Sequence, residues 1–376
     1  MKRVPLVGLA AQEATVAEEV LAAVADVARD GRFVLGPRVE AFERWLAEAC
    51  GGGHAVGVAS GTDAIELSLR ALGVGAGDSV VTPAFSFVAA AEAIAATGAR
   101  PVFCDVDPVS MNATAGTVKQ AIDRARAAGL RVRAIVPVHL FGLCAPLGAL
   151  SAIARQERLV LVEDAAQAIG ARDGAGRAAG ALGDAGCFSF FPTKNLGAWG
   201  DGGAVVTSDE AVAKRLRRLR AHGAVAPYAH AEAGRNSRLD ELQAAVLLAK
   251  AKHLADWQHA RAHAAERYLR ELEGLPLALP PVPAAPAVHA WHAFVVRVPR
   301  GRDALSAWLH ERGVETRVYY PIPLHRQECF RGLSEPDLPY AEQASATALA
   351  LPMFAALTDE QQTRVIDQIA QFFRSR

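Results

Sequence analysis

The sequence predicts an α/β fold in which a mostly parallel sheet is covered by helices on both faces. Short, continuously apolar runs typical of buried strands recur along the first half of the chain, and each alternates with a run of helical length. The predicted strands are residues 55–59, 79–83, 101–106, 134–139 and 159–164. The predicted helices between them are residues 64–72, 88–97, 117–128 and 147–156. Ligands of such sheets bind at the carboxyl ends of the strands, so we expect the functional site at that edge.

The remaining elements lie on either side of this alternating region. A glycine- and proline-containing break at residues 31–37 separates two predicted N-terminal helices, 11–29 and 39–49. The later elements are, in order, a basic helix at 210–220, a long helix that opens at 235–241 and ends near 272, a proline-rich linker at 275–288, a strand at 291–298, a helix at 302–312, a strand at 315–320 and a helix at 358–373. We therefore predict a large domain, residues 1–250, and a smaller α+β domain, residues 251–376.

Charge and composition exclude several classes of protein. The chain of 376 residues carries 40 basic and 40 acidic side chains, so no net field recruits nucleic acid or an anionic membrane. No apolar run reaches the roughly 20 residues that span a bilayer, and we find no export signal at the start. The five cysteines are widely spaced and form no Cys-x-x-Cys pair, which argues against disulfide or metal frameworks. We therefore expect a cytoplasmic protein without nucleic-acid or membrane partners.

Two patterns that could suggest other cofactors have simpler explanations. Residues 73–77 are glycine-rich, but they follow a predicted helix and so lack the strand-turn-helix context of a dinucleotide-binding motif. His253, His259 and His263 share one predicted helix without any further ligand, and exposed histidines are the commoner explanation. No metal site is therefore expected.

One lysine stands apart from the other five of the chain. Lys194 lies in the apolar and glycine-rich stretch 188–203, with no carboxylate within helical reach. A desolvated lysine loses proton affinity and becomes an amine nucleophile, as a Schiff base with a carbonyl or with pyridoxal phosphate (PLP) requires. Taken alone, the stretch fits a solvated loop lysine at least as well, so the other motifs must decide.

The turn Ser60-Gly61-Thr62-Asp63 lies between a predicted strand and a predicted helix. Ser60 and Asp63 have the spacing of a capping box, with Asp in place of the usual Glu. Free N–H groups and the helix dipole make such a turn a potential anion site. A plain helix cap is the more frequent explanation of this motif by itself.

PLP needs a lysine, a carboxylate facing the pyridine nitrogen, a helix N-terminus with hydroxyls for the phosphate, and a flat side chain on the ring. The sequence offers all four, with an amide for the phenolic oxygen: Lys194, Asp164, the turn 60–63 with Ser189, Phe87 and Gln167. Each has an ordinary alternative, since an aspartate can cap a helix and a phenylalanine can be core. Their joint occurrence near predicted strand ends is what favours a cofactor site.

Six segments together resemble the DegT/DnrJ/EryC1/StrS family of PLP-dependent aminotransferases, which act on nucleotide-linked keto sugars. They are residues 60–64 (SGTDA), 83–87 (PAFSF), 138–142 (VHLFG), 163–167 (EDAAQ), 188–196 (FSFFPTKNL) and 236–240 (NSRLD). The resemblance runs from about residue 30 to the C-terminus, in order and at similar spacing. It implies a fold-type I homodimer with active sites shared across the subunit interface.

The resemblance also implies residue roles. Lys194 would form the Schiff base and then move protons between cofactor and sugar, and Asp164 would pair with the pyridine nitrogen. The other implied cofactor contacts are Gly61, Thr62, Asp63 and Ser189 at the phosphate, Gln167 at the phenolic oxygen, Phe87 on the ring, and Asn236 toward the partner subunit's cofactor. The implied substrate contacts are Phe33, His139, Arg238, Tyr319, Tyr320 and His325. Phe141 and Ile169 depart from the family pattern, which leaves substrate contacts rather than chemistry in question.

The expected reaction is amino transfer from glutamate to a keto sugar on a nucleoside diphosphate. The presence of Lys194 favours amino transfer over dehydration. In the sugar dehydratases related to this family, the resemblance places a histidine at that position. We expect a 3-keto hexose or hexuronate as acceptor. The open alternatives are a 4-keto sugar, a cyclitol or an aromatising reaction, and a non-catalytic protein that binds a sugar nucleotide.

Overall fold

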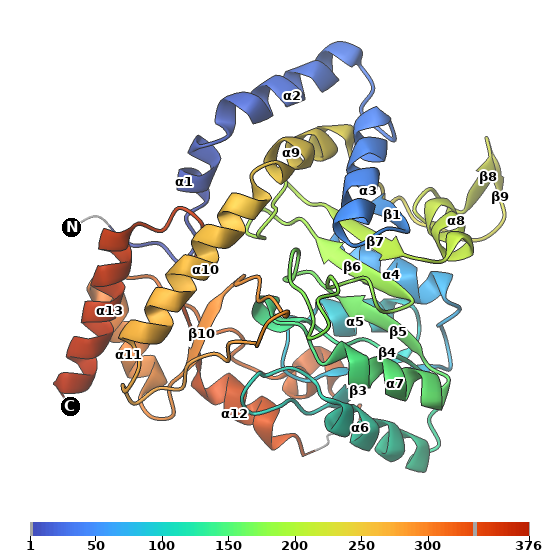
Figure 1. The fold of residues 1–376 in the computed structure, drawn as a ribbon. Helices are drawn as coiled ribbons and strands as arrows, with labels where there is room; N and C mark the ends of the chain where they lie inside the picture. The colour runs from blue at the N-terminus through green and yellow to red at the C-terminus, as the bar shows by residue number, and fades with distance from the viewer. Residues whose placement is uncertain (1–2, 334–336, 376) are drawn as a thin grey trace.

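A seven-stranded sheet forms the centre of the protein in this computed structural model, which describes residues 3–333 and 337–375. The strand order is β1-β7-β6-β5-β4-β2-β3. Their bounds are β1 His54–Val58, β2 Ser79–Pro83, β3 Arg100–Cys104, β4 Val132–Ile135, β5 Val160–Asp164, β6 Ala185–Ser189 and β7 Gly203–Thr207. Only β7 runs antiparallel to its neighbours. The predicted α/β fold with a mostly parallel sheet is confirmed (Figure 1).

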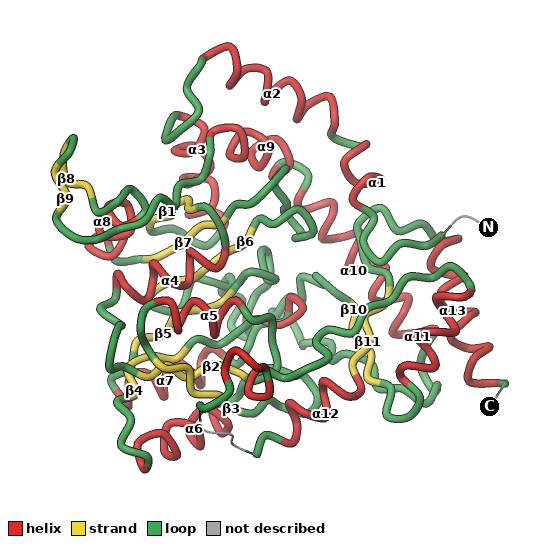
Figure 2. Tube along the Cα trace, turned by 180° about the vertical axis from the view of Figure 1, so that it is seen from behind, coloured by secondary structure: helices red, strands yellow, loops and turns green. Residues whose placement is uncertain are grey.

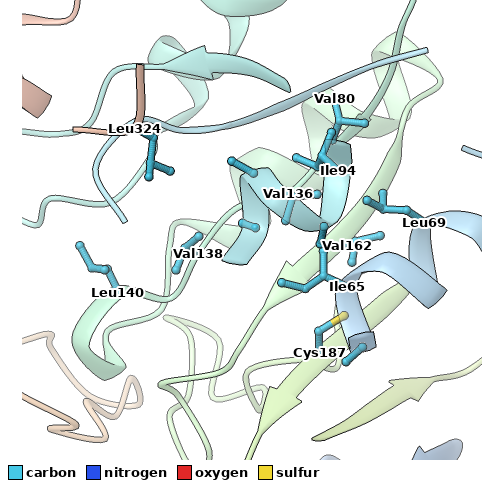
Figure 3. Packing of buried hydrophobic residues seen from close by; sticks show 14 of the residues in the cluster. Ile65, Leu69, Val80, Ile94, Val136, Val138, Leu140, Val162, Cys187 and Leu324 are labelled. Carbon is cyan, nitrogen blue, oxygen red and sulfur yellow. The ribbon is translucent and has the colours of Figure 1, made fainter. Parts of the chain in front are cut away.

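Helices cover both faces of this sheet, as its continuously apolar strands require. One face carries α4 (Gly61–Ala71), α5 (Ala89–Ala96) and α8 (Glu210–Leu219), and the other carries α3 (Pro37–Ala49), α6 (Ala115–Ala127), α7 (Leu147–Glu157) and α9 (Glu241–Ala251). Adjacent strand residues enter different cores: Val80 packs on the first face and Val81 on the second. Figure 3 shows α4 and α5 side chains packed on the first face, where each buried aliphatic side chain contributes about 1.5–3 kcal/mol.

The C-terminal third has a core of its own. Its elements are α10 (Leu254–Glu271), β10 (Phe294–Arg297), α11 (Arg302–Glu311), α12 (Pro339–Thr347), β11 (Ala348–Leu351) and α13 (Asp359–Arg374). Strands β10 and β11 pair antiparallel, and Val4 from the N-terminal end joins the same core. Figure 2 shows this part beside the main sheet from behind. The predicted domain boundary between residues 250 and 251 stays a prediction.

Several predicted elements differ from the structure. The long helix breaks at Lys252 and His253 into α9 and α10, and the N-terminal helix breaks after residue 14 into α1 (Leu9–Ala14) and α2 (Ala17–Asp30). The predicted strand 315–320 is wrong. Tyr319 and Tyr320 both pack against Phe141 instead of pointing to opposite sides as strand neighbours do, and β10 pairs with the unpredicted β11.

Two smaller features were also missed. A hairpin of β8 (Ala224–Ala226) and β9 (Ala229–His230) projects from the molecule (Figure 1). Arg220, at the C-terminus of the basic helix α8, is buried and forms an ion pair with Glu43. Within the described ranges, we find no helix with the length and apolar character needed to cross a bilayer.

Candidate active site

The carboxyl edge of the sheet gathers most of the predicted cofactor residues. Asp164 ends β5 and Ser189 ends β6, and these two strands pair in parallel. Helix α4 begins three residues after β1, at the same edge, and Lys194 lies in the loop that follows β6. Parallel strands end at one edge, which is why residues from three separate segments meet there.

Lys194 combines partial burial with an unpaired amine. Burial lowers the pKa of its amine to about 8, while the charge of Asp164 opposes this shift. In the described part of the chain its amine makes no hydrogen bond or ion pair, whereas the buried Lys250 binds Glu13 and the carbonyl of Gly197. The Lys194 amine is therefore unprotonated far more often near neutral pH than that of an ordinary lysine, and this unprotonated form can act as a nucleophile.

Asp164 offers a buried carboxylate at the end of the central strand. Its Oδ1 accepts a hydrogen bond of 3.1 Å from the N–H of Ala166. Burial raises the pKa of this carboxyl group, and the charge of Lys194 partly offsets the effect. A protonated ring nitrogen placed beside it would restore the ionised form, so the site fits a pyridinium partner.

His139 and Glu163 form a fully buried pair next to Asp164. The ring Nε2 lies 2.9 Å from Glu163, and Nδ1 accepts from the N–H of Ala145 at 3.1 Å. The His139 side chain is inaccessible and has no free nitrogen to offer a sugar. Its predicted substrate contact is therefore corrected to a structural role. The backbone N–H of His139 donates to the backbone carbonyl of Asp164 at 3.0 Å, which helps to fix the end of β5.

Glu163→Gln is expected to lower the free energy of unfolding by about 3 kcal/mol. The carboxylate accepts from His139 and from the N–H groups of Gly180, Leu182 and Gly183 at 2.7, 2.7 and 2.5 Å. An amide NH2 would face one of these donors. The pKa of Glu163 is lowered by His139 and these N–H groups despite burial, so its stabilisation is present above the unfolded pKa and lost as pH falls through the folded pKa.

Urea denaturation of this variant at neutral and acidic pH measures both effects. The exposed Glu273→Gln is the matched control and should unfold like the wild type. An unchanged urea midpoint for Glu163→Gln at neutral pH would contradict the assigned role.

The start of α4 forms a cradle for an anion. Ser60 caps the helix by accepting from the N–H of Asp63 at 3.1 Å, while the N–H groups of Gly61 and Thr62 have no partner in the described residues. A Cβ on Gly61 would lie 2.6 Å from the Cβ of Ser189, so only glycine lets β6 approach this turn. Two free N–H groups, a hydroxyl and the helix dipole fit a phosphate.

Asp63 does not join this cradle. Its N–H is used by Ser60, and its carboxylate accepts from the hydroxyl of Ser237 at 2.6 Å. An aspartate also repels a phosphate, so the predicted cofactor contact of Asp63 is corrected to a link between α4 and the segment before α9. Ser237, which had no predicted role, additionally accepts from the N–H of Ala59.

Gln167 and Tyr320 connect the carboxyl edge of the sheet to a group of aromatic side chains. This group, the aromatic wall, consists of Phe87, Tyr319 and Tyr320. The amide of Gln167 accepts from the N–H of Phe141 at 2.7 Å and donates to the Tyr320 hydroxyl at 3.0 Å. The ring of Tyr320 lies 6.2 Å from that of Phe87, which is 54% exposed and free to cover a ligand. Burial raises the pKa of Tyr320, so its phenol stays protonated at neutral pH.

The other predicted substrate residues are less closely grouped. Tyr319 belongs to the wall, but His325 is buried and its Nε2 bonds to Glu342 of α12 at 3.2 Å. Phe33 and Asn236 are exposed and Arg238 is half-buried. The predicted target of Asn236 belongs to a second subunit, so its role stays a prediction.

Comparison with known proteins identifies the family of this chain. The profile of the DegT/DnrJ/EryC1/StrS aminotransferase family matches residues 14–370. The UDP-N-acetyl-3-dehydro-alpha-D-glucosamine 3-aminotransferase of Acidithiobacillus ferrooxidans is 44% identical over 362 residues, 96% of each chain. The dTDP-3-amino-3,4,6-trideoxy-alpha-D-glucose transaminase of Streptomyces venezuelae is 44% identical over 374 residues, 98% of this chain and 96% of that one.

Two solved structures have the same fold. DesV of S. venezuelae, crystallised in complex with a ketimine intermediate, superimposes with a TM-score of 0.94 at 43% identity and covers 99% of both chains. NtdA of Bacillus subtilis, with bound cofactor PMP, has a TM-score of 0.91 at 30% identity, covering 100% of this chain and 86% of that one.

Proposed function

Because the chain belongs to the DegT/DnrJ/EryC1/StrS aminotransferase family, we propose that it uses PLP to transfer an amino group from glutamate to a nucleotide-linked keto sugar. The observation that carries the proposal is the unpaired Lys194 amine, with a pKa of about 8, beside the buried Asp164. A structural lysine would be paired, as Lys250 is.

The site residues divide the work of holding the cofactor. Gly61, Thr62 and Ser189 would hold the phosphate, Phe87 would cover the ring, and Gln167 would meet the phenolic oxygen. When bound, the cofactor supplies an electron sink for bond changes at the amino-bearing carbon. Asp164 would keep the ring nitrogen protonated, and Lys194 would take and return a proton at the carbon that exchanges its amino group.

The acceptor we propose is a 3-keto hexose or hexuronate on a nucleoside diphosphate. The names of both relatives refer to amination at the 3-position of a nucleotide-linked sugar, which is linked to UDP in the first and to dTDP in the second. The aromatic wall of Phe87, Tyr319 and Tyr320 supports an acceptor with flat or ring-shaped groups, and the Tyr320 phenol offers a proton to a sugar oxygen.

We further propose a cytoplasmic homodimer with shared active sites. Its support is the family resemblance, together with exposed aromatic side chains on the described surface that a second subunit would cover: Phe33, Phe191, Trp199 and Tyr228. Tyr228 stands fully exposed at the tip of the β8–β9 hairpin.

The purified protein with PLP is expected to show a visible absorption band that converts to the pyridoxamine form when glutamate is added. The reason is that Lys194 can leave the cofactor once a donor amine replaces it. A band that ignores glutamate would overturn the proposed donor. No band after reconstitution with PLP would favour the non-catalytic alternative.

Only the 3-keto sugar is expected to be aminated when matched 3-keto and 4-keto nucleotide sugars are offered to the glutamate-treated enzyme. Mass spectrometry of the product and return of the visible band measure the result. Amination of the 4-keto sugar alone would overturn the 3-keto assignment. A ketone panel without a nucleotide tests the cyclitol alternative in the same assay.

A further inference from the structure

Asn195, the residue after Lys194, is tied to a segment almost a hundred residues away. Its side chain is buried, and Nδ2 donates to the carbonyl of Ala290 at 2.7 Å. A carbonyl can only accept, so this bond fixes which end of the amide is nitrogen. The amide oxygen therefore faces the Nδ1 atom of His292, at 3.3 Å, and must accept there.

The bond to Asn195 fixes the tautomer of His292. Because Nδ1 carries the proton, Nε2 of the neutral ring is an unprotonated acceptor. Nε2 has no hydrogen-bond partner in the described part of the chain. Burial, with the charges of Lys194 and Arg261, keeps the pKa of this imidazole well below its usual range, so the ring stays uncharged.

The position of His292 is held by rigid neighbours. Its N–H donates to the carbonyl of Phe141 at 2.9 Å, and Arg261 donates to the carbonyl of Trp291 at 3.2 Å. A Cβ on Gly142 would lie only 3.0 Å from the N–H nitrogens of Trp291 and His292, which shows how closely the two segments approach. These contacts hold the backbone of His292 in place next to the segment that contains Phe141 and Gly142.

A small cavity lies next to this residue. Its lining includes His292, Thr193 and Tyr319, so it borders the lysine loop and the aromatic wall. Its volume of about 30 Å³ suffices for about one water molecule. Three of its lining residues, His292, Thr193 and Tyr319, carry polar side-chain groups of the kind that a water needs as partners.

We propose that Asn195 and His292 are positioning residues for Lys194: Asn195 fixes the lysine loop and the His292 tautomer, and His292 presents an uncharged hydrogen-bond acceptor to the lysine amine. A neutral amine has two N–H groups and one lone pair. Donation of one N–H toward Nε2, directly or through the cavity water, turns the lone pair away from His292 and toward the site. The inference rests on the proposed function for the identity of the nucleophile.

Two substitutions separate the two nitrogens of His292. His292→Asn keeps an N–H donor near the place of Nδ1, and so the bond to Asn195, but removes the acceptor at Nε2. His292→Gln brings an amide oxygen near the place of Nε2. The exposed His263→Asn is the matched control on α10.

The measurement is the rate at which the visible band forms when PLP is added to full-length, cofactor-free protein across a range of pH. Well above the lysine pKa, His292→Asn is expected to react about tenfold more slowly than wild type, the worth of one hydrogen bond. Asn195→Ala should show a similar loss, His292→Gln should recover part of the rate, and the control should match wild type. In turnover, kcat should fall while KM for the sugar nucleotide stays unchanged.

Two results would overturn the inference. One is a wild-type rate in His292→Asn. The other is a loss that tracks a fall in the thermal midpoint, with normal reactivity of the folded fraction and no recovery in His292→Gln, which would leave only a structural role. The rate is measured without any sugar, so a protein that reacts normally with PLP but aminates no keto sugar would contradict the proposed function alone.

Discussion

Lys194→Ala is expected to lower amino transfer by at least about a thousandfold and to prevent the visible band of the covalently joined cofactor. Among the described lysines, Lys250 is also buried, but its amine is held by Glu13 and the carbonyl of Gly197. The phosphate cradle does not depend on Lys194, so the variant should still bind PLP without a covalent link. Absorption spectra, equilibrium dialysis with PLP and turnover with glutamate measure the three effects.

Lys194→Arg and Lys214→Ala sharpen this test. Arginine keeps the positive charge but has a pKa far too high to give a neutral nucleophile, so it should be as inactive as alanine. Lys214 is exposed and pairs with Glu210 one helical turn away, so its loss should leave activity at the wild-type level. Retention of full turnover by Lys194→Ala would sink the assignment of the nucleophile.

The sheet and the central site residues were predictable because they depend on local patterns. An apolar run of five residues bounded by turns specifies a buried strand, and the residues that follow such runs fall at one edge. Asp164 and Gln167 could be placed in this way, because they lie at and just after the predicted strand 159–164. Strand β6 was not predicted, so the roles of Ser189 and Lys194 depended on the family resemblance. The order of the strands and the antiparallel course of β7 depend on pairing between distant segments, which no local pattern encodes.

The residues assigned wrongly are those whose partners lie far along the chain. His139 lies at a predicted strand end and was assigned a substrate contact, but its ring forms a hydrogen bond with Glu163, 24 residues later in the chain. Asp63 was assigned to the anion site, but its carboxylate accepts a hydrogen bond from the hydroxyl of Ser237, 174 residues later in the chain. For His139, the sequence contained one signal that could have indicated its pairing with Glu163. Glu163 and Asp164 are consecutive in a strand, so their side chains point to opposite faces and only one of them can reach the cofactor.

Asp164→Asn is expected to lower kcat by about a thousandfold while leaving the fold intact. An amide keeps the size of the side chain and an oxygen to accept from the N–H of Ala166, so the local structure has no reason to change. It cannot carry the negative charge that keeps a ring nitrogen protonated, and the electron sink is weakened. The effect should therefore appear in the chemical step and not in the urea midpoint.

The pH dependence separates this role from simple packing. Burial raises the pKa of the Asp164 carboxyl group, so in the cofactor-free protein the charged form is gained only as pH rises through a value above the usual one. A protonated ring nitrogen stabilises the carboxylate, so cofactor binding should shift this titration to lower pH and release a proton when the pH lies between the two values. Calorimetry of PLP binding in buffers of different ionisation enthalpy measures that proton. Asp164→Asn should lose it, and a variant that releases the same proton as wild type would show that Asp164 is not the partner of the ring.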